Sequence, residues 1–323
     1  MPDAMTFAMV GTVLGLLGMA TGAGHLLKRQ GDVGIDSAVV EQFNLRIRSW
    51  WMLCAALAAA FLAGPIVTMI LFGGLSFWAL REFITLTPTR AADHRTLFWV
   101  FFVFTPLQYV LVGIEEYGLY SIVIPVYGFL FIPTRVAMAG DFKRYLERCA
   151  KIQAGLMICV YCLSHAPALL TLNIPDYDNR RLLFFFVLVV VAGDAFCYVC
   201  EKLIGKHQIA PAINANRTWE GFLGGMACAT LFGVALHWAT PFGKDIVTGG
   251  TSAGVLVTAG MSLAITIMGY AGGLTMSAIK RDRGVKDYGT LVEGHGGVLD
   301  RIDSICFAAP VFFHFTRLLV ASP

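Results

Sequence analysis

Residues 277–303 read SAIKRDRGVKDYGTLVEGHGGVLDRID, a concentration of charge in a chain of which 14% is charged and 57% apolar. Charged side chains are costly beside lipid, so this segment lies outside any bilayer and separates the apolar runs on either side of it. Near its end, His295 has Gly294 before it and Gly296 and Gly297 after it. Glycine reaches positive φ and can turn backbone N–H groups toward an anion. Cations, carboxylates and this glycine turn together indicate a site for a metal-bound polyphosphate.

The remainder of the 323 residues is apolar enough for a polytopic membrane protein, and the net charge of +3 is small. No basic arm is present, so we expect no nucleic-acid partner. The apolar run at 5–27 has no Lys or Arg before it, which favours a retained first span over a cleaved signal. Most of the eight cysteines lie inside apolar runs and are expected to pack rather than to form disulfides.

We expect an all-α integral membrane protein with about ten transmembrane helices, because lipid offers no partner to open backbone groups. Gly64-Pro65 interrupts a long apolar run and predicts a break between two spans that form a hairpin. We divide the chain into N-terminal transmembrane helices, 1–150, and a C-terminal catalytic region, 151–323, with polar segments at 201–221 and 277–303. The expected spans are 5–27, 50–63, 66–80, 96–113, 117–133, 152–172, 182–200, 221–240, 251–276 and 304–321.

The basic residues predict how these spans are oriented across the membrane. If the N-terminus is outside, nearly every Lys and Arg falls in an odd-numbered connection; the exceptions are Arg180, Arg181 and Lys244, with Arg317 inside the last span. By the positive-inside rule the crowded side is cytoplasmic. Both polar segments then face the cytoplasm, where nucleotides are found.

Asp194 is the ionisable residue that lies deepest in an apolar run, FFFVLVVVAGDAFCYV. A charge at that depth indicates function unless it pairs with a neighbouring helix or a loop lysine, which is the structural alternative. Arg217, Thr218 and Glu220 come just before the glycines at 221, 224 and 225. Those glycines suit either close helix packing or the approach of a phosphate.

The C-terminal half resembles the phosphatidate cytidylyltransferase (CDP-diacylglycerol synthase) family. The main match is Ser277-x-Ile279-Lys280-Arg281-x4-Lys286-Asp287-x-Gly289, followed by His295-Gly296-Gly297-x-x-Asp300-Arg301-Ile302-Asp303. That family's second motif is similar to Gly205-Lys206-His207-x-x-Ala210-Pro211 and Arg217-Thr218-Trp219-Glu220-Gly221. The N-terminal half matches only as a series of spans.

This resemblance implies transfer of a cytidylyl group from CTP to phosphatidate, giving CDP-diacylglycerol and pyrophosphate. It also implies Mg²⁺ as a cofactor, and a second cation, monovalent or divalent, is left open. Two anions must approach each other, so cations have to offset their repulsion. The expected catalytic residues are Asp287, Lys280, Arg281, Lys286 and His295, with His295 as a phosphate donor because an ionised attacking phosphate needs no base. The expected substrate-binding residues are Ser277, Arg217, Thr218, Glu220, Arg301, Gly296 and Gly297, and the expected metal ligands are Asp194, Asp287, Asp300 and Asp303.

The chain also departs from the family pattern. Gly272-Gly273-Leu274 stands where the family usually reads Gly-Asp-Leu, so an expected metal-binding carboxylate is absent. Glu293 or Asp282 could substitute for it. The alternative is a catalytically impaired paralogue that binds lipid or nucleotide or scaffolds phospholipid synthesis. Arg217, which replaces the family's Lys, keeps the charge but changes its geometry.

Other expectations concern the membrane in which the protein lies, its partners, and structural roles for the cysteines and histidines. No organellar targeting segment is evident and the loops are short, which favours a multi-pass protein of a bacterial inner membrane. The partners we expect are CTP, phosphatidate and membrane lipids, and a homodimer is left open. The pairs Cys159/Cys162 and Cys197/Cys200 allow a zinc site but suit packing better. His165 and His237 are expected to join helices.

Overall fold

The computed structural model describes residues 11, 15, 18, 21, 58–60, 62–87, 89–243, 251–289 and 296–321. Within them, seven helical segments are long and apolar enough to cross a membrane. Many large apolar side chains on these helices point outward, for example Ile66 at 75% and Leu256 at 73% exposure. Such a surface is favourable only against lipid. The chain is therefore an α-helical, multi-pass integral membrane protein.

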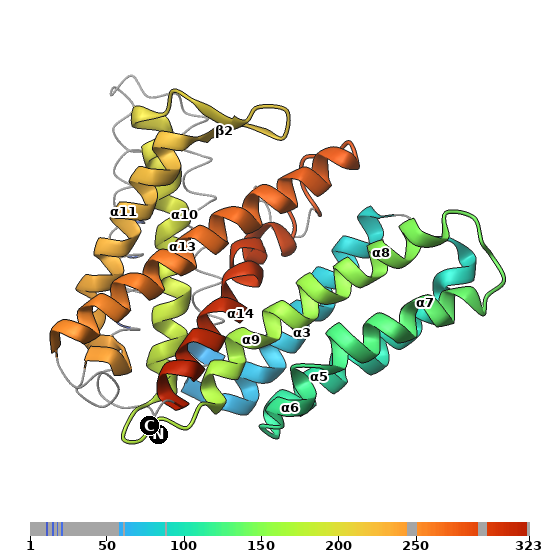
Figure 1. The fold of residues 1–323 in the computed structure, drawn as a ribbon, viewed down its shortest axis with the longest axis horizontal. Coiled ribbons are helices and arrows are strands. Elements are labelled where there is room, and N and C mark those ends of the chain that lie inside the picture. Colours follow the sequence, from blue (N-terminus) through green and yellow to red (C-terminus); the bar gives the residue numbers. More distant parts are fainter. Residues whose placement is uncertain are drawn as a thin grey trace.

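The first described spans pair in antiparallel fashion (Figure 1). α3 (Pro65–Leu86) is one continuous α-helix. Each of the next three spans consists of several pieces, joined by short turns of π- or 3₁₀-helix. Their elements are η1 (Ala91–Asp93), α4 (His94–Trp99), η2 (Val100–Phe104) and α5 (Thr105–Gly113); α6 (Tyr117–Tyr120), η3 (Val123–Gly128) and α7 (Phe129–Ala137); then α8 (Tyr145–Leu156), η4 (Met157–Cys162), α9 (Leu163–Ala168) and η5 (Leu169–Thr171).

The second half holds the polar segments. α10 (Asn179–Ile204) leads into a small antiparallel hairpin of β1 (Gln208–Ala210) and β2 (Asn214–Thr218), in which Gln208 pairs with Thr218. α11 (Trp219–Ala235) follows directly. After η6 (His237–Ala239) and η7 (Pro241–Gly243) come the long α13 (Thr251–Asp282) and α14 (Leu299–Ala321).

The expected spans can be compared with these elements. The break at Gly64-Pro65 is confirmed: Gly64 has φ 119° and Pro65 is the first residue of α3. The expected span at 221–240 was too long, because α11 has 17 residues and gives way to 3₁₀ turns after Leu236. The hairpin is a small exception to an all-α fold. The run 5–27 and nearly all of 50–63 lie outside the described residues, so ten spans stay a prediction.

Close packing of glycines joins α11 to α10. A Cβ built on Gly225 would lie 2.5 Å from the Cα of Cys197, and one on Gly221 would lie 2.8 Å from the Cα of Glu201. Small residues let membrane helices approach to this extent. Of the two explanations for these glycines, helix packing is therefore the one seen. α14 in turn packs against α9 and α3 on one side and against α10 and α13 on the other (Figure 1).

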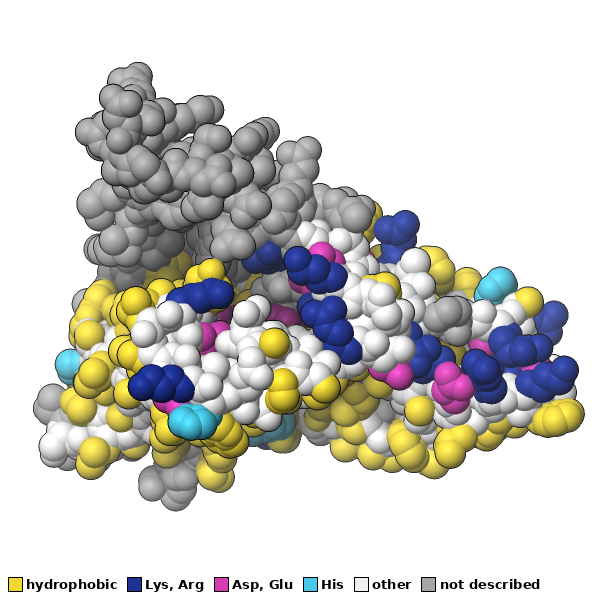
Figure 2. Space-filling view, turned by 90° about the horizontal axis from the view of Figure 1, so that it is seen from above, with side chains coloured by type: hydrophobic (Ala, Val, Ile, Leu, Met, Phe, Trp, Pro, Cys, Tyr) yellow, Lys and Arg dark blue, Asp and Glu magenta, His cyan; other side chains and the backbone are white. Residues whose placement is uncertain are grey.

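The polar connections gather at one end of the molecule, here called the charged face. It comprises the ends of the helices near Leu86, Ala137, Tyr145, Ile204, Asp282 and Leu299, together with the β1–β2 hairpin. Figure 2 looks onto this face and shows Lys and Arg side chains spread across it, with Asp and Glu among them and apolar side chains toward the rim. This grouping is what the predicted direction of the spans requires.

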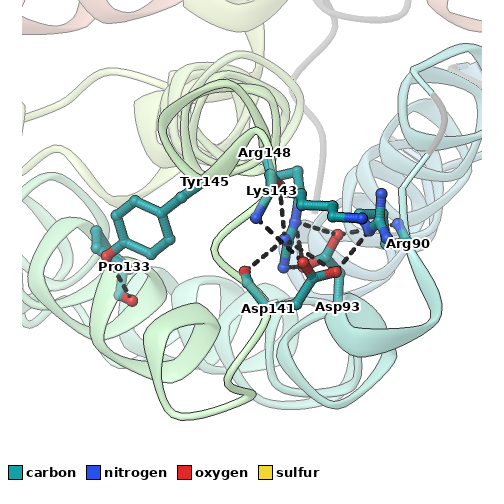
Figure 3. Close-up of polar contacts among 7 residues, drawn as sticks. All are labelled: Arg90, Asp93, Pro133, Asp141, Lys143, Tyr145 and Arg148. Carbon is teal, nitrogen blue, oxygen red and sulfur yellow. Dashed lines mark hydrogen bonds and ion pairs between the residues drawn. The ribbon is translucent and has the colours of Figure 1, made fainter.

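A buried ion cluster fixes the charged face on the side of the first spans (Figure 3). Arg148 of α8 is 3% exposed, and its Nη2 lies 2.6 Å from Oδ1 of Asp93, which is fully buried. Arg148 Nη1 donates to the carbonyl oxygens of Asp141 and Lys143 at 2.7 and 2.9 Å. Arg90 pairs with Asp141 at 2.5 Å. The cluster ties the connection before α4 to the connection before α8.

Candidate functional site

The second half of the charged face brings the two polar segments together. α10 packs against α11 and α13, and β2 contacts both α10 and α13. The C-terminal part of α10 carries Asp194 and Glu201 toward the hairpin that holds Arg217. α13 ends beside the hairpin with Lys280 and Arg281, and α14 starts there with Asp300 and Asp303. Residues from both sequence motifs thus share one site.

Arg217 is the centre of a first cluster. Its Nη1 lies 3.2 Å from Glu201 Oε1, and its Cζ lies 4.6 Å from the centroid of the Tyr270 ring. The Tyr270 hydroxyl donates to the same Glu201 oxygen at 3.4 Å. The side chains of Arg217 and Glu201 are 18% and 4% exposed, so their charges act through little water. A guanidinium has five N–H donors, which leaves Arg217 able to bind an anion as well.

Gly273 faces this cluster. A Cβ built on it would lie 3.2 Å from Arg217 Nη2 and 4.0 Å from Asp303 Oδ2. Asp194 is hydrogen bonded to the side chain of Ser304 and interacts electrostatically with Arg217 and with Asp303. Two of the expected metal ligands, Asp194 and Asp303, are therefore close neighbours. The position of the absent carboxylate lies beside them.

Asp300 is the centre of a second cluster. Its Oδ1 accepts a hydrogen bond from Lys280 Nζ at 2.8 Å, and the two side chains are 6% and 14% exposed. Its Oδ2 accepts the backbone N–H groups of Tyr288 and Gly297 at 2.8 and 2.9 Å. Asp300 therefore binds the loop before α14 to the end of α13, and both of its oxygens are engaged.

The glycine turn places Asp287 beside Asp300. Gly296 has φ +82°, as its predicted role in a turn requires. A Cβ at this position would lie 2.8 Å from Asp300 Oδ2 and 3.0 Å from Asp287 Cβ. Asp287 is exposed, and within the described part of the chain no hydrogen bond or ion pair engages its carboxylate. His295 and Glu293 lie outside the described residues, so their assigned roles stay predictions.

Three of the expected substrate-binding side chains bond to the backbone. Thr218 Oγ1 accepts the Gly221 N–H at 3.2 Å and caps α11. The N–H groups of Lys206 and His207, together with the His207 ring, hold the pKa of Glu220 at about 2, well below its ordinary value. Ser277 Oγ donates to the Gly273 carbonyl at 2.7 Å. These side chains shape the loops around the site, and a direct contact with substrate stays a prediction.

The remaining basic residues surround the end of α13. Arg281 donates to the carbonyl oxygens of Ile213 and Val285 at 3.2 and 3.3 Å, which joins α13 to the hairpin. Lys286 is exposed, and Arg301 in the first turn of α14 is partly exposed. The two clusters thus have further cations close to them.

Two residues that shape the site were not predicted. Tyr270 lies in an apolar run and gave no signal, because its partners come from α10 and β2. Glu82, near the end of α3, accepts the backbone N–H groups of Val298 and Leu299 at 3.0 and 2.8 Å. A carboxylate at the end of a span could have drawn attention, but nothing in the sequence points it toward residues so far along the chain.

The carboxylates of the site differ in how well they fit a metal ion. Among the residues that the structure describes, no group of three or more His, Cys, Asp or Glu could hold a metal ion alone, so the zinc alternative gains no support. Mg²⁺, however, usually binds through one or two carboxylates plus substrate phosphates and keeps several waters. Among the described residues, no group engages the Asp287 carboxylate, and Asp303 accepts the Ser304 N–H with Oδ1 and not with Oδ2. These residues fit a Mg²⁺ ion that arrives with a nucleotide.

Comparison with known proteins shows the family of this chain. A family model described as "Cytidylyltransferase family" matches residues 44–319. The chain belongs to the cytidylyltransferase family. The uncharacterized protein YnbB of Escherichia coli (strain K12) is 35% identical over 280 residues, which cover 85% of this chain and 88% of YnbB. The family resemblance read from the two motifs is thereby confirmed.

Two named relatives of this cytidylyltransferase chain match a shorter part of it. The phosphatidate cytidylyltransferase of Staphylococcus aureus (strain COL) is 34% identical over 134 residues, 42% of this chain and 48% of that enzyme. The phosphatidate cytidylyltransferase of Haemophilus influenzae is 34% identical over 140 residues, 43% of this chain and 46% of that enzyme. The chain thus spans about half the length of these two relatives.

Proposed function

We propose that this member of the cytidylyltransferase family transfers the cytidylyl group of CTP to phosphatidate, giving CDP-diacylglycerol and pyrophosphate. Family membership and the names of the relatives support the reaction. The observation that carries the proposal is the site itself: Asp287 lies in the cluster of Asp300 and Lys280, Asp303 lies beside Gly273 and the cluster of Arg217, and among the described residues no group engages the Asp287 carboxylate or Asp303 Oδ2. They stand where apolar helices end at a charged face, so a lipid phosphate can enter from the bilayer edge and CTP from solution.

No protein side chain has to form a covalent bond in this reaction. A phosphate oxygen of phosphatidate attacks the α-phosphorus of CTP, the bond from that phosphorus to the bridging β-oxygen breaks, and pyrophosphate leaves with the electron pair. The attacking oxygen is already ionised, so no general base is needed. Lys280, Lys286, Arg281 and Arg301 offset the repulsion between the two anions and hold them in line.

Magnesium completes the charge balance in this proposal. When bound, Mg²⁺ stabilises the charge that develops on the leaving pyrophosphate. Asp287 and Asp303 would hold it together with phosphate oxygens, and Asp194 and Asp300 would orient the helices around it. A second cation, monovalent or divalent, is part of the same proposal.

We place the active site at the cytoplasmic leaflet of a bacterial inner membrane. Lys and Arg are concentrated in the connections of the charged face, which the positive-inside rule assigns to the cytoplasm. The relatives named above are bacterial. CTP, phosphatidate and the surrounding lipids are the partners in this arrangement, and a homodimer is compatible with it.

An impaired paralogue is the second candidate, and the geometry at Gly273 favours it. The guanidinium of Arg217 lies 3.2 Å from where a Cβ of residue 273 would be. The chain's own cation therefore lies beside Asp194 and Asp303 where an additional carboxylate would stand. A protein of this kind would bind CTP or lipid without turning them over.

The test is the CTP- and Mg²⁺-dependent conversion of phosphatidate by the purified protein in detergent. Asp287→Ala should lower turnover at least ~100-fold, because it removes the open carboxylate of the site. Glu116→Ala is the control: Glu116 is exposed in the turn between α5 and α6, away from the charged face, and its variant should be silent. Turnover that persists in Asp287→Ala would overturn the assigned site. CTP binding without turnover in the parent would favour the paralogue.

A further inference from the structure

Glu82 is an acidic residue of α3 that the proposed chemistry does not use. It is 6% exposed, and α3 belongs to the first half of the chain. Its Oε1 accepts the N–H of Val298 at 3.0 Å and its Oε2 accepts the N–H of Leu299 at 2.8 Å. The bonded residues are 216 and 217 positions away in the sequence. One carboxylate thus receives the backbone of the segment that carries Asp300.

Two glycines close around this carboxylate. A Cβ on Gly289 would lie 2.8 Å from Glu82 Oε1 and 3.3 Å from the Cα of Gly297. A Cβ on Gly297 would lie closer still to Glu82 Oε2. Any side chain at either position would collide with the carboxylate. Gly297, one of the glycines that the sequence presents as an anion-binding turn, therefore lies in this molecule against an anion that the protein itself supplies.

Phe83, the residue after Glu82 in α3, contacts Tyr288 at the start of the connection between α13 and α14. The Phe83 ring stacks on the Tyr288 ring with centroids 6.3 Å apart. The Tyr288 hydroxyl donates to the Met276 carbonyl at 3.2 Å, and its N–H bonds to Asp300. Asp287 directly precedes this anchored tyrosine and is exposed. The end of α3 therefore holds the chain at two places that follow Asp287: at Tyr288 through Phe83, and at Val298 and Leu299 through Glu82.

Charge explains why the contact is with a carboxylate. The first N–H groups of a helix have no partner within it, and an anion there is stabilised by the helix dipole. With Glu82 in place, two N–H groups at the start of α14 are already bonded. They are not free to bind a substrate phosphate, so phosphate binding falls to basic side chains such as Lys280.

We propose that Glu82 is a positioning residue for the active site: its carboxylate fixes the start of α14 and the glycine turn, and thereby aims Asp287 and Asp300 at the metal-bound nucleotide. The inference rests on the proposed function. It adds a residue from the first half of the chain to a site otherwise built from the second half. Glu82 acts through Asp287 and Asp300 and does not itself contact the reacting atoms.

The test is Glu82→Gln, with Glu116→Gln as the matched control. Glutamine keeps the size of the side chain, but its NH₂ group must face one of the two N–H donors and cannot accept from it. Glu116 is exposed in the turn between α5 and α6, so its variant removes the same charge far from the site. We expect Glu82→Gln to lower kcat at least ~10-fold and to raise the Mg²⁺ concentration for half-maximal turnover several-fold. The thermal midpoint should fall by no more than about 4 °C.

A merely structural role predicts a different pattern. Activity would then follow the folded fraction, and the Mg²⁺ requirement of the remaining activity would equal that of the parent. That result, or parent-like kcat and Mg²⁺ dependence in Glu82→Gln, would overturn the inference.

Two further readouts do not depend on turnover. Hydrogen exchange in residues 296–304 should be ~10-fold faster in Glu82→Gln than in Glu116→Gln, because two amide bonds are weakened. Half-maximal binding of CTP should also need several-fold more Mg²⁺ in the variant. If the parent makes no CDP-diacylglycerol, the proposed function fails; Glu82 is then judged on these two measurements, and unchanged exchange would overturn its role.

Discussion

Placing a carboxylate at position 273 tests how the site handles charge. In Gly273→Asp the new Cβ would lie 3.2 Å from Arg217 Nη2, which is the far end of a flexible side chain and can move by a few tenths of an ångström. The carboxylate would then lie between the Arg217 guanidinium and Asp303 Oδ2. We expect the variant to fold and to turn over substrate at lower Mg²⁺ than the parent.

The magnitude follows from the two neighbours. Unit charges about 4 Å apart interact by roughly 4 kcal/mol at an effective dielectric constant near 20. Attraction to Arg217 is opposed by repulsion from Asp303 and also from Asp194, so without a divalent cation the free energy of unfolding should fall by up to about 4 kcal/mol. A divalent cation reverses the sign of the Asp303 contribution because it binds both carboxylates. A net gain of about 1.4 kcal/mol corresponds to a tenfold lower Mg²⁺ requirement.

The assay is a Mg²⁺ titration of CDP-diacylglycerol formation at saturating CTP, alongside thermal unfolding in the same detergent. Gly273→Asn is the control, because it adds nearly the same volume without charge. A half-maximal Mg²⁺ concentration that is unchanged in Gly273→Asp, or lowered equally in Gly273→Asn, would refute the reasoning. An inactive parent that gains turnover in Gly273→Asp would support the impaired-paralogue reading.

Other predictions follow from the loops. Arg148→Ala should cost about 3–5 kcal/mol of unfolding free energy, since it leaves a buried carboxylate unpaired, whereas Arg144→Ala, at 78% side-chain exposure, should be nearly silent; equal thermal midpoints would contradict this. Because the pKa of Glu220 is lowered to about 2, its stabilisation of the hairpin should be complete above its ordinary pKa of 4.5 and be lost as the pH falls toward 2. Hydrogen exchange at Lys206 should therefore be accelerated by Glu220→Gln at neutral pH, and an unchanged rate would contradict the role of Glu220.

Much of the fold can be predicted because lipid imposes simple rules. Apolar runs locate the helices, and proline after glycine locates the start of α3 at Pro65. The end of α11 could not be predicted, because the apolar run continues to residue 240 although the helix leaves its geometry at Leu236. The hairpin was also missed: Gln208–Thr218 lacks the alternation of apolar and polar residues that marks a strand, and its neighbours α10 and α13 hold it.

In the site, too, contacts between residues close in sequence could be predicted, whereas contacts between separate helices could not. Local sequence was enough to predict a glycine turn with positive φ at Gly296, and the family resemblance was enough to group Asp287 with Asp300, which lie close together. Tyr270 and Glu82 escaped prediction since each is a single polar group at or near an apolar run whose partners come from other helices. Their importance depends on tertiary packing, which periodicity and spacing do not encode.

The bond between Glu82 and the start of α14 also constrains how the protein can be made. A ribosome completes α3 more than two hundred residues before it makes the amides of Val298 and Leu299. During that interval the carboxylate has none of its final partners and has to stay at the watery boundary of the membrane. The arrival of the last helix is therefore the event that draws Glu82 inward. In a fragment of residues 151–323, the start of α14 would therefore lack the Glu82 carboxylate that holds it in the whole chain.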